Sequence, residues 1–230
     1  MGKQSAVFIP GLLCTAALFA PQVKGLADIA DIAIGDHTRH DLVGDAAQAI
    51  LDDAPDRFAL AGLSMGCYIA FEIMRREPQR VTKLALMDSS ARPDTIEQSG
   101  RRRALMAEAE RNGLTGVVDV LLPLFVHKDR LTDTQLTSLV HDMAEETGVT
   151  AFIRQQRAIM SRPDSRPGLA AISCPVTVIV GDGDILTPPD LAREMADGIG
   201  SARLEIIEGA GHLSTLEKPD AVTAVLRAWL

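Results

Sequence analysis

The strongest structural signal in this chain is the stretch RFALAGLSMGCYIAFEIM, residues 57–74. Its first part is an apolar run that predicts a strand, and its last part has the pattern of a helix. The G-x-S-x-G pattern from Gly62 to Gly66 lies between them. So tight a turn forces Ser64 into a strained backbone conformation, and larger side chains at either glycine would collide with the neighbouring strand and helix. The stretch therefore predicts a nucleophile elbow with the Ser64 hydroxyl at the edge of a sheet.

Short apolar runs alternate with amphipathic stretches along most of the remaining chain. The run Val176–Val180 is almost continuously apolar, as expected for a parallel strand that is covered on both faces. The alternation predicts an α/β fold, in which a mostly parallel, doubly wound sheet of about six strands carries helices on both faces. The predicted strands are Ala6–Pro10, Ile29–Ile34, Phe58–Gly62, Lys83–Asp88, Val176–Gly181 and Arg203–Glu208, and the predicted helices are Asp41–Asp52, Ser64–Arg76, Pro189–Asp197 and Pro219–Leu230.

One long segment interrupts this alternation, because no strand pattern occurs between about residues 92 and 171. Four helical segments are expected there: Thr95–Asn112, Leu114–Val126, Asp133–Thr147 and Val149–Met160. The proline- and glycine-containing stretch 163–168 then predicts the turn back to the sheet. We therefore expect a core made of residues 1–91 and 172–230, with residues 92–171 inserted after the fourth strand as a helical lid over the rim of the sheet.

Composition excludes several classes of protein. A net charge of −8 argues against nucleic acid as a partner, because phosphate would repel the protein. No segment approaches the roughly 18 apolar residues of a membrane span, and Pro10-Gly11 breaks the apolar stretch near the amino terminus, so neither membrane insertion nor a signal peptide is expected. The three cysteines are widely spaced and lack a C-x-x-C pattern, which predicts reduced thiols, no metal site and a cytoplasmic protein.

A serine hydroxyl is a poor nucleophile, so Ser64 needs a base and the base needs an orienting acid. His212 is the expected base. It lies in the stretch GAGHL, residues 209–213, directly after the last predicted strand, where small residues allow a loop to bring the imidazole over the rim of the sheet. The other four histidines fall in polar loops or in the expected lid, and we expect them to be exposed; they are His37, His40, His127 and His141.

Two aspartates lie in the stretch GDGD, residues 181–184, which follows the strand Val176–Val180 and opens on the same rim. Asp184 is the preferred acid, whereas Asp182 is expected to make local hydrogen bonds in the turn. Asp88 is the rival for the role of acid, because it ends the preceding predicted strand and also faces this rim.

An acyl-transfer transition state further requires two donors for the developing oxyanion. The backbone N–H of Met65 is one candidate, because it lies at the amino end of the helix that begins at the elbow. The second donor is expected in the loop after the first strand, where Gly11 permits a turn. The Leu12 N–H is preferred there, with the Leu13 N–H as the alternative.

Together these residues resemble the α/β-hydrolase family. The matching features are the elbow 62–66, the Pro10-Gly11-Leu12 loop, the stretch 181–184 and the stretch 209–212, in the family's order of nucleophile, acid and histidine. The resemblance implies Ser64 as nucleophile, Asp184 as acid and His212 as base, with no cofactor. The chain departs from the family pattern at Pro10, where many members have a histidine. It also lacks the usual first hairpin of the family, so a smaller sheet is expected.

The resemblance implies a hydrolase of small, largely apolar carboxylic esters or lactones. Side chains that could line the substrate pocket, or else pack against the sheet and each other, are Leu13 and, in the lid, Leu121, Leu122, Leu124, Phe125, Met143, Phe152 and Met160. The arginine run Arg101–Arg103, together with Arg154 and Arg157, is expected on solvated helix faces rather than at a carboxylate.

The same triad leaves other activities open. Family members also cleave carbon–carbon bonds, transfer acyl groups, make peracids without a cofactor, or act as small-molecule receptors that dock a partner protein through the lid. The protein is expected to be a monomer or a homodimer, with a small-molecule ester as its main partner.

Overall fold

Six parallel strands form one sheet in the computed structural model, which describes residues 2–230. Their order across the sheet is β2-β1-β3-β4-β5-β6. The strands are β1 (Gln4–Ile9), β2 (Ala30–Ile34), β3 (Phe58–Leu63), β4 (Val81–Met87), β5 (Val176–Gly181) and β6 (Arg203–Ile207). Each predicted strand is present, with its bounds shifted by two residues at most, and the predicted parallel sheet is confirmed.

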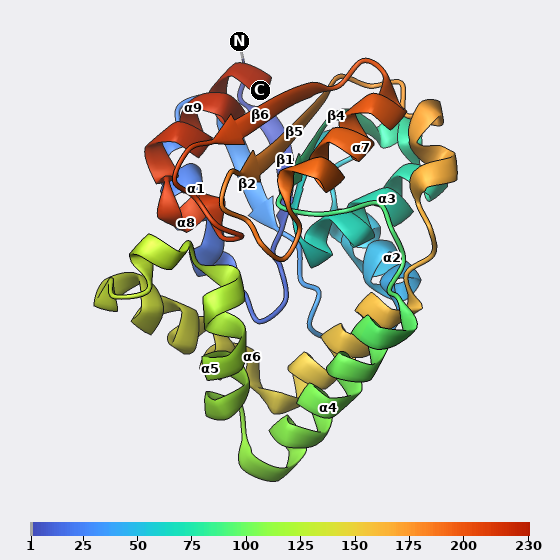
Figure 1. Ribbon diagram of the computed structural model, residues 1–230. Helices are drawn as coiled ribbons and strands as arrows, with labels where there is room; N and C mark the ends of the chain where they lie inside the picture. The colour runs from blue at the N-terminus through green and yellow to red at the C-terminus, as the bar shows by residue number, and fades with distance from the viewer. Residues whose placement is uncertain (1) are drawn as a thin grey trace.

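Helices cover both faces of this sheet, as expected. In Figure 1, α1, α8 and α9 lie on one side of it and α2, α3 and α7 on the other. These helices are α1 (Ala20–Leu26), α2 (Val43–Asp53), α3 (Met65–Arg76), α7 (Pro189–Ile199), α8 (Ser214–Glu217) and α9 (Pro219–Trp229). Helices α1 and α9 pack against each other on their side of the sheet. Neither α1 nor the single turn α8 was predicted from the sequence.

The core lies between the sheet and these two helical layers. Every residue of β3 and of β5 is buried, which explains why both strands are apolar on both faces apart from Thr177 in β5. Phe8 of β1 meets Phe19 edge to face, with ring centroids 5.2 Å apart, on the face that α1 covers. Because aromatic residues are few, aliphatic side chains and alanine fill most of the remaining interior.

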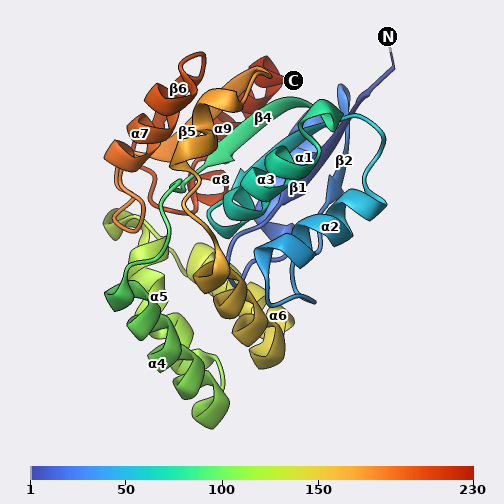
Figure 2. The ribbon, with the colours of Figure 1, turned by 90° about the vertical axis from the view of Figure 1, so that its right-hand side faces the viewer.

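The segment after β4 folds as three helices: α4 (Ile96–Asn112), α5 (Thr115–Phe125) and α6 (Thr134–Ser161). They lie beyond the carboxyl ends of the strands in both views (Figures 1 and 2). Within α6 the backbone leaves the helical region at Gly148, where φ is +75°, so the two predicted segments meet at a kink. The helical insertion after the fourth strand is confirmed; its treatment as a unit separate from the core stays a prediction.

Among the described residues, no helix combines the length and the apolar character that crossing a bilayer requires.

Candidate active site

The elbow has the geometry that its sequence predicts. Ser64 follows β3 directly and precedes α3, and its backbone has φ +52° and ψ −112°. A non-glycine residue at positive φ is strained, and the structure holds it there through backbone hydrogen bonds on both sides. The Ser64 N–H donates to the carbonyl of Met87 at 2.9 Å, and the Ser64 carbonyl accepts from the Cys67 N–H at 3.0 Å. The hydroxyl is thereby fixed at the rim of the sheet.

The two glycines of the elbow lie where the backbone leaves no room for a side chain. A Cβ atom on Gly66 would lie 2.0 Å from the carbonyl oxygen of Ile9 in β1. A Cβ on Gly62 would lie 2.5 Å from the backbone of Gly66 itself. Atoms cannot approach so closely, so a side chain at either position would force the helix and the strands apart.

Three rim loops bring Ser64, His212 and Asp184 together. His212 Nε2 lies 2.8 Å from Ser64 Oγ, and His212 Nδ1 lies 2.8 Å from Asp184 Oδ2. With Nδ1–H donating to the carboxylate, Nε2 carries a free lone pair and accepts the hydroxyl hydrogen. His212 and Asp184 are both 2% exposed, so the contact between them is shielded from water.

Hydrogen bonds fix the Asp184 carboxylate in place. Its Oδ1 accepts from the N–H groups of Leu186 (2.9 Å) and Thr187 (2.8 Å), and its Oδ2 also accepts from the Thr187 hydroxyl at 2.7 Å. Burial opposes ionisation, but the attraction of His212 and these hydrogen bonds outweigh it and hold the pKa of Asp184 below its usual value. Burial likewise disfavours a charged His212, yet the charge of Asp184 raises the His212 pKa above its usual value.

The two competing aspartates have other partners. Asp88 is fully buried at φ +45°, where its carboxylate accepts from the Gly181 N–H at 2.9 Å and contacts the Ser214 hydroxyl. Burial and the neighbouring charge of Asp184 raise the pKa of Asp88 to about 8. Asp182 accepts from the Gly209 N–H at 2.8 Å, so it ties two rim loops together rather than making the local turn expected of it. Neither carboxylate contacts His212.

The loop that carries His212 is held by a carboxylate that sequence reasoning missed. Glu217, 2% exposed, accepts from the Gly211 N–H and from the His127 N–H, both at 2.8 Å. The first bond fixes the residue before His212, and the second connects that loop to the end of α5. Phe125, also at the end of α5, stacks on the His212 imidazole with ring centroids 5.9 Å apart. The lid therefore contacts the base directly.

Of the two candidate oxyanion donors in the loop after β1, one is occupied and the other is free. The Leu13 N–H donates to Gln155 Oε1 at 3.1 Å and is therefore occupied. The Leu12 N–H has no hydrogen-bond partner within residues 2–230. The Met65 N–H opens α3, where the first amides of a helix have no intrahelical acceptor. This geometry favours Leu12 over Leu13, and the two donors remain a proposal.

His37 is buried, so the prediction that it is exposed was wrong. It is 2% exposed, and its Nε2 lies 2.9 Å from the carbonyl oxygen of Gly11. Gln155 Nε2 lies 3.3 Å from the same imidazole nitrogen. His37 and Gln155 thus hold the backbone on both sides of Leu12. Burial lowers the pKa of His37, so the imidazole is neutral at pH 7 and donates its hydrogen to Gly11.

A cavity of about 90 Å³ opens beside Ser64 under the lid. Of the side chains expected to line it, Leu121 and Phe125 do. The prediction is corrected for Leu13, Leu122, Leu124, Met143, Phe152 and Met160, which do not line the cavity. Ile159, one helix position before Met160, faces the cavity instead. One position turns a helical side chain by about 100°, so the sequence alone did not specify which face of the lid points inward. Phe152 instead lies fully buried in the core.

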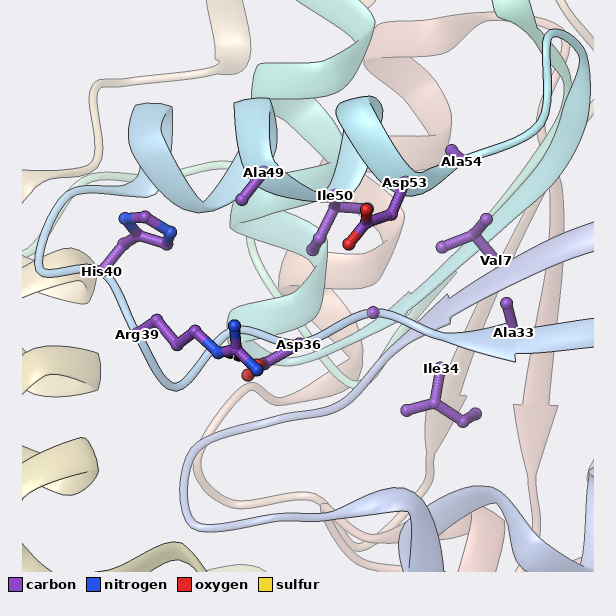
Figure 3. Close-up of a pocket in the computed structure, with 11 residues that line it drawn as sticks. Val7, Ala33, Ile34, Asp36, Arg39, His40, Ala49, Ile50, Asp53 and Ala54 are labelled. Atoms are coloured by element: carbon purple, nitrogen blue, oxygen red, sulfur yellow. Dashed lines mark ion pairs between the residues drawn. The ribbon is translucent and has the colours of Figure 1, made fainter.

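A second cavity, of about 200 Å³, lies between α2, β2 and the loop that follows β2 (Figure 3). Arg39 reaches back to Asp36 there, with Nε and Oδ2 2.8 Å apart, while Ile50 and Asp53 point toward the strand from α2 (Figure 3). None of Ser64, Asp184 and His212 lines this cavity. This cavity is therefore separate from the candidate active site. Within residues 2–230, no cluster of histidine, cysteine and acidic side chains has a metal-binding arrangement.

Comparison with known proteins agrees with the fold. A model of the alpha/beta hydrolase family matches residues 7–225. A Mycobacterium tuberculosis protein named "Putative non-heme bromoperoxidase BpoC" is 34% identical over 204 residues, or 83% of this chain and 74% of that protein. The pimeloyl-[acyl-carrier protein] methyl ester esterase of Neisseria meningitidis serogroup C is 26% identical over 188 residues, or 80% of this chain and 72% of that one. The solved structure of a thermophilic esterase from Thermogutta terrifontis has a TM-score of 0.90 at 25% identity, covering 100% of this chain and 90% of that chain.

Proposed function

The chain belongs to the alpha/beta hydrolase family, and on that premise we propose that it is a serine hydrolase of small carboxylic esters or lactones. The observation that carries the proposal is the continuous contact from Asp184 through His212 to Ser64, with both hydrogen bonds at 2.8 Å. In this arrangement a neutral histidine is ready to take a proton from the serine.

The first half of the reaction forms an acyl-enzyme. His212 Nε2 takes the hydroxyl proton as Ser64 Oγ attacks the ester carbonyl, and the carbonyl oxygen becomes an oxyanion. The N–H groups of Leu12 and Met65 hold that oxyanion. When the tetrahedral intermediate collapses, the bond to the leaving oxygen breaks and His212 returns the proton to that oxygen. The alcohol departs, and the acyl group stays on Ser64.

The second half repeats these steps with water. His212 takes a proton from a water molecule, whose oxygen attacks the acyl carbonyl. Collapse of the second intermediate releases the carboxylic acid and restores the Ser64 hydroxyl with the proton from His212. Asp184 stays ionised throughout, orients the imidazole and stabilises its charged form. The strained elbow keeps Ser64 Oγ in position through both halves.

The size of the cavity supports a small substrate. Its volume of about 90 Å³ is well below the roughly 300–1,000 Å³ of pockets that hold drug-sized ligands. Much of its wall is aliphatic or aromatic, which suits a short hydrocarbon part of an acyl or alcohol group. The apolar lining residues are Leu12, Leu105, Leu121, Phe125, Ile159, Leu186 and Leu191.

The test is hydrolysis of p-nitrophenyl esters from acetate to octanoate by wild type, Ser64→Ala and Ser138→Ala. Ser138 is an exposed serine on α6, so its alanine variant is the matched control. We expect short esters to be preferred and Ser64→Ala to lose at least about 10³-fold in kcat. A folded wild type that hydrolyses no ester above background would contradict the proposal and favour a receptor or a carbon–carbon hydrolase.

The name of the Mycobacterium tuberculosis relative favours one alternative, cofactor-free perhydrolysis. On the same acyl-enzyme, hydrogen peroxide would replace water in the second half, and the product would be a peracid instead of a carboxylic acid. The peracid would then oxidise bromide outside the site. Peracid formation from acetate ester and peroxide, faster than hydrolysis of that ester, would select this reaction.

A further inference from the structure

The wall of the active-site cavity that the lid provides is positively charged. Arg102 of α4 and Arg162, which follows α6, both line the cavity, and no carboxylate side chain does. Their side chains are 20% and 6% exposed. From the sequence, Arg102 was expected on a solvated helix face, where its neighbours Arg101 and Arg103 do lie. In the structure Arg102 lines the cavity that Ser64 also lines.

One acid is shared between these two guanidinium groups. Asp94, with a side chain 2% exposed, accepts from Arg102 Nε at 2.7 Å and pairs with Arg162 Nη1 at 2.6 Å. Arg162 also donates to the carbonyls of Arg92 and Ile159 and stacks 4.2 Å above the Tyr68 ring. It is therefore fixed as a structural residue. Two cations and one anion leave this cluster of Arg102, Arg162 and Asp94 with a charge of +1, and a buried charge is costly unless an opposite charge lies close to it.

A buried amide extends this donor surface. Gln156 of α6 is 0% exposed and lines the cavity, and its Oε1 accepts from Arg102 Nη1 at 2.9 Å. A guanidinium only donates, so the amide oxygen must face Arg102 and the amide nitrogen must point elsewhere. That nitrogen, Nε2, has no hydrogen-bond partner within residues 2–230 and is the one such buried atom among the cavity-lining side chains. An unpartnered buried donor beside an unbalanced positive charge is suited to an anion.

We propose that the substrate carries a carboxylate a few bonds away from its scissile ester, and that Arg102 and Gln156 bind that carboxylate. The inference rests on the proposed ester hydrolase function and specifies its substrate class. Ser64 and Arg102 line one cavity of about 90 Å³, so the reacting carbonyl and the carboxylate belong to one short molecule. A half-ester of a small dicarboxylic acid has this chemistry.

Binding to the Ser64→Ala protein tests the site without turnover. Calorimetry would compare monomethyl succinate, which carries one carboxylate, with neutral dimethyl succinate. We expect the half-ester to bind about 10-fold tighter or more, as hydrogen bonds to a charged group imply. Adding Arg102→Gln should abolish the preference, while Arg103→Gln, an exposed neighbour on the same helix, should leave it unchanged. Equal binding of both esters, or equal loss in both arginine variants, overturns the proposal.

A second variant guards against misfolding after the loss of Arg102. Gln156→Glu keeps an acceptor for Arg102 and neutralises the extra charge, so it should remove the preference with both arginines in place. Gln135→Glu, exposed on the same helix α6, makes the same charge change as a control. An unchanged preference in Gln156→Glu overturns the proposal.

Hydrolysis of monomethyl succinate and dimethyl succinate by the wild-type protein is measured separately from binding. A wild-type protein that prefers monomethyl succinate in binding but hydrolyses neither ester would contradict the hydrolase function and leave the carboxylate site standing. Hydrolysis of both esters at equal kcat/KM, with equal binding, would keep the hydrolase function and reject the carboxylate site.

Discussion

Gln155 Oε1 accepts a hydrogen bond from the Leu13 N–H, across 142 positions of sequence, at 3.1 Å. Leu13 has a φ of +58°, a strained conformation for leucine, so this bond helps to hold the loop after β1 in an unfavourable shape. The adjacent Leu12 N–H has no hydrogen-bond partner within residues 2–230 and stays available. A residue of the lid thus positions a donor that we assign to the oxyanion.

Removing this contact should impair the chemical step. We expect Gln155→Leu to lower kcat by about 10-fold while KM changes little, because the oxyanion exists only in the transition state. The buried Leu13 N–H would also lose its acceptor, at a cost of about 1–3 kcal/mol in the free energy of unfolding. Ester kinetics and denaturant unfolding measure the two effects, with exposed Gln135→Leu on the same helix as control. A loss of stability with unchanged kcat would contradict the positioning role.

The pH dependence of activity should report the His212 pKa. Burial lowers that pKa, but Asp184 outweighs burial and raises it above the ordinary value of 6.5. His212 must be neutral to accept the Ser64 proton, so kcat/KM should fall as pH drops through a midpoint above 6.5. The same raised pKa affects the free energy of unfolding. Protonated His212 stabilises the folded state at pH values below 6.5, and this contribution is lost as pH rises through the raised pKa of His212. An acid limb centred below 6.5 in the pH profile of kcat/KM would show that His212 is not the base we assign.

Asp88 should make the fold less stable as pH rises. Its pKa is raised from 3.8 to about 8, mainly by burial, so the folded chain keeps a proton that the unfolded chain releases. Stability falls with pH wherever the folded state binds more protons, here between those two values. Asp88→Asn mimics the protonated form, so its unfolding free energy relative to wild type should increase from about pH 5 to about pH 7.5. Thermal unfolding measures this, with exposed Asp56→Asn as the matched charge control, and a constant or decreasing difference contradicts it.

The strands and the triad could be predicted because their signals are local. Continuous apolar runs mark the buried strands, and Ser64, Asp184 and His212 each follow a strand within a loop rich in small residues. Helix α1 could not be predicted in this way, because Pro21 and Gly25 weaken its pattern. Its packing against α9, where Gly25 faces Thr223, is a tertiary contact that no local pattern shows.

The supporting residues were missed because their partners are distant in sequence. His37 contacts Gly11, Gln155 contacts Leu13, and Glu217 contacts the backbone of His127, 90 positions away. Polar residues such as these are predicted to be exposed when their distant partners are not known. The helices of the lid could be predicted from the sequence. The faces that they turn inward could not, because those faces depend on packing against the sheet.

Two glycine substitutions test the steric account of the elbow. In Gly66→Ala the new Cβ would lie 2.0 Å from the Ile9 carbonyl oxygen, so we expect a loss of more than about 4 kcal/mol in unfolding free energy, or no folded protein. In Gly100→Ala, on exposed α4, the Cβ meets no atom within 4 Å, and helix propensity should add about 0.5–1 kcal/mol. Denaturant unfolding of both variants is the measurement. A Gly66→Ala protein as stable as wild type would contradict the close approach of α3 to β1.

The central claim is that His212 and Asp184 activate Ser64 as a nucleophile. The most direct measurement is intact-mass and peptide analysis after treatment with a fluorophosphonate, which loses fluoride when a serine oxygen attacks its phosphorus. The account predicts one adduct, located on Ser64, that forms at least about 10²-fold more slowly in His212→Ala and is absent from Ser64→Ala. A folded wild-type protein that forms no adduct, or forms it on another residue, would contradict the account.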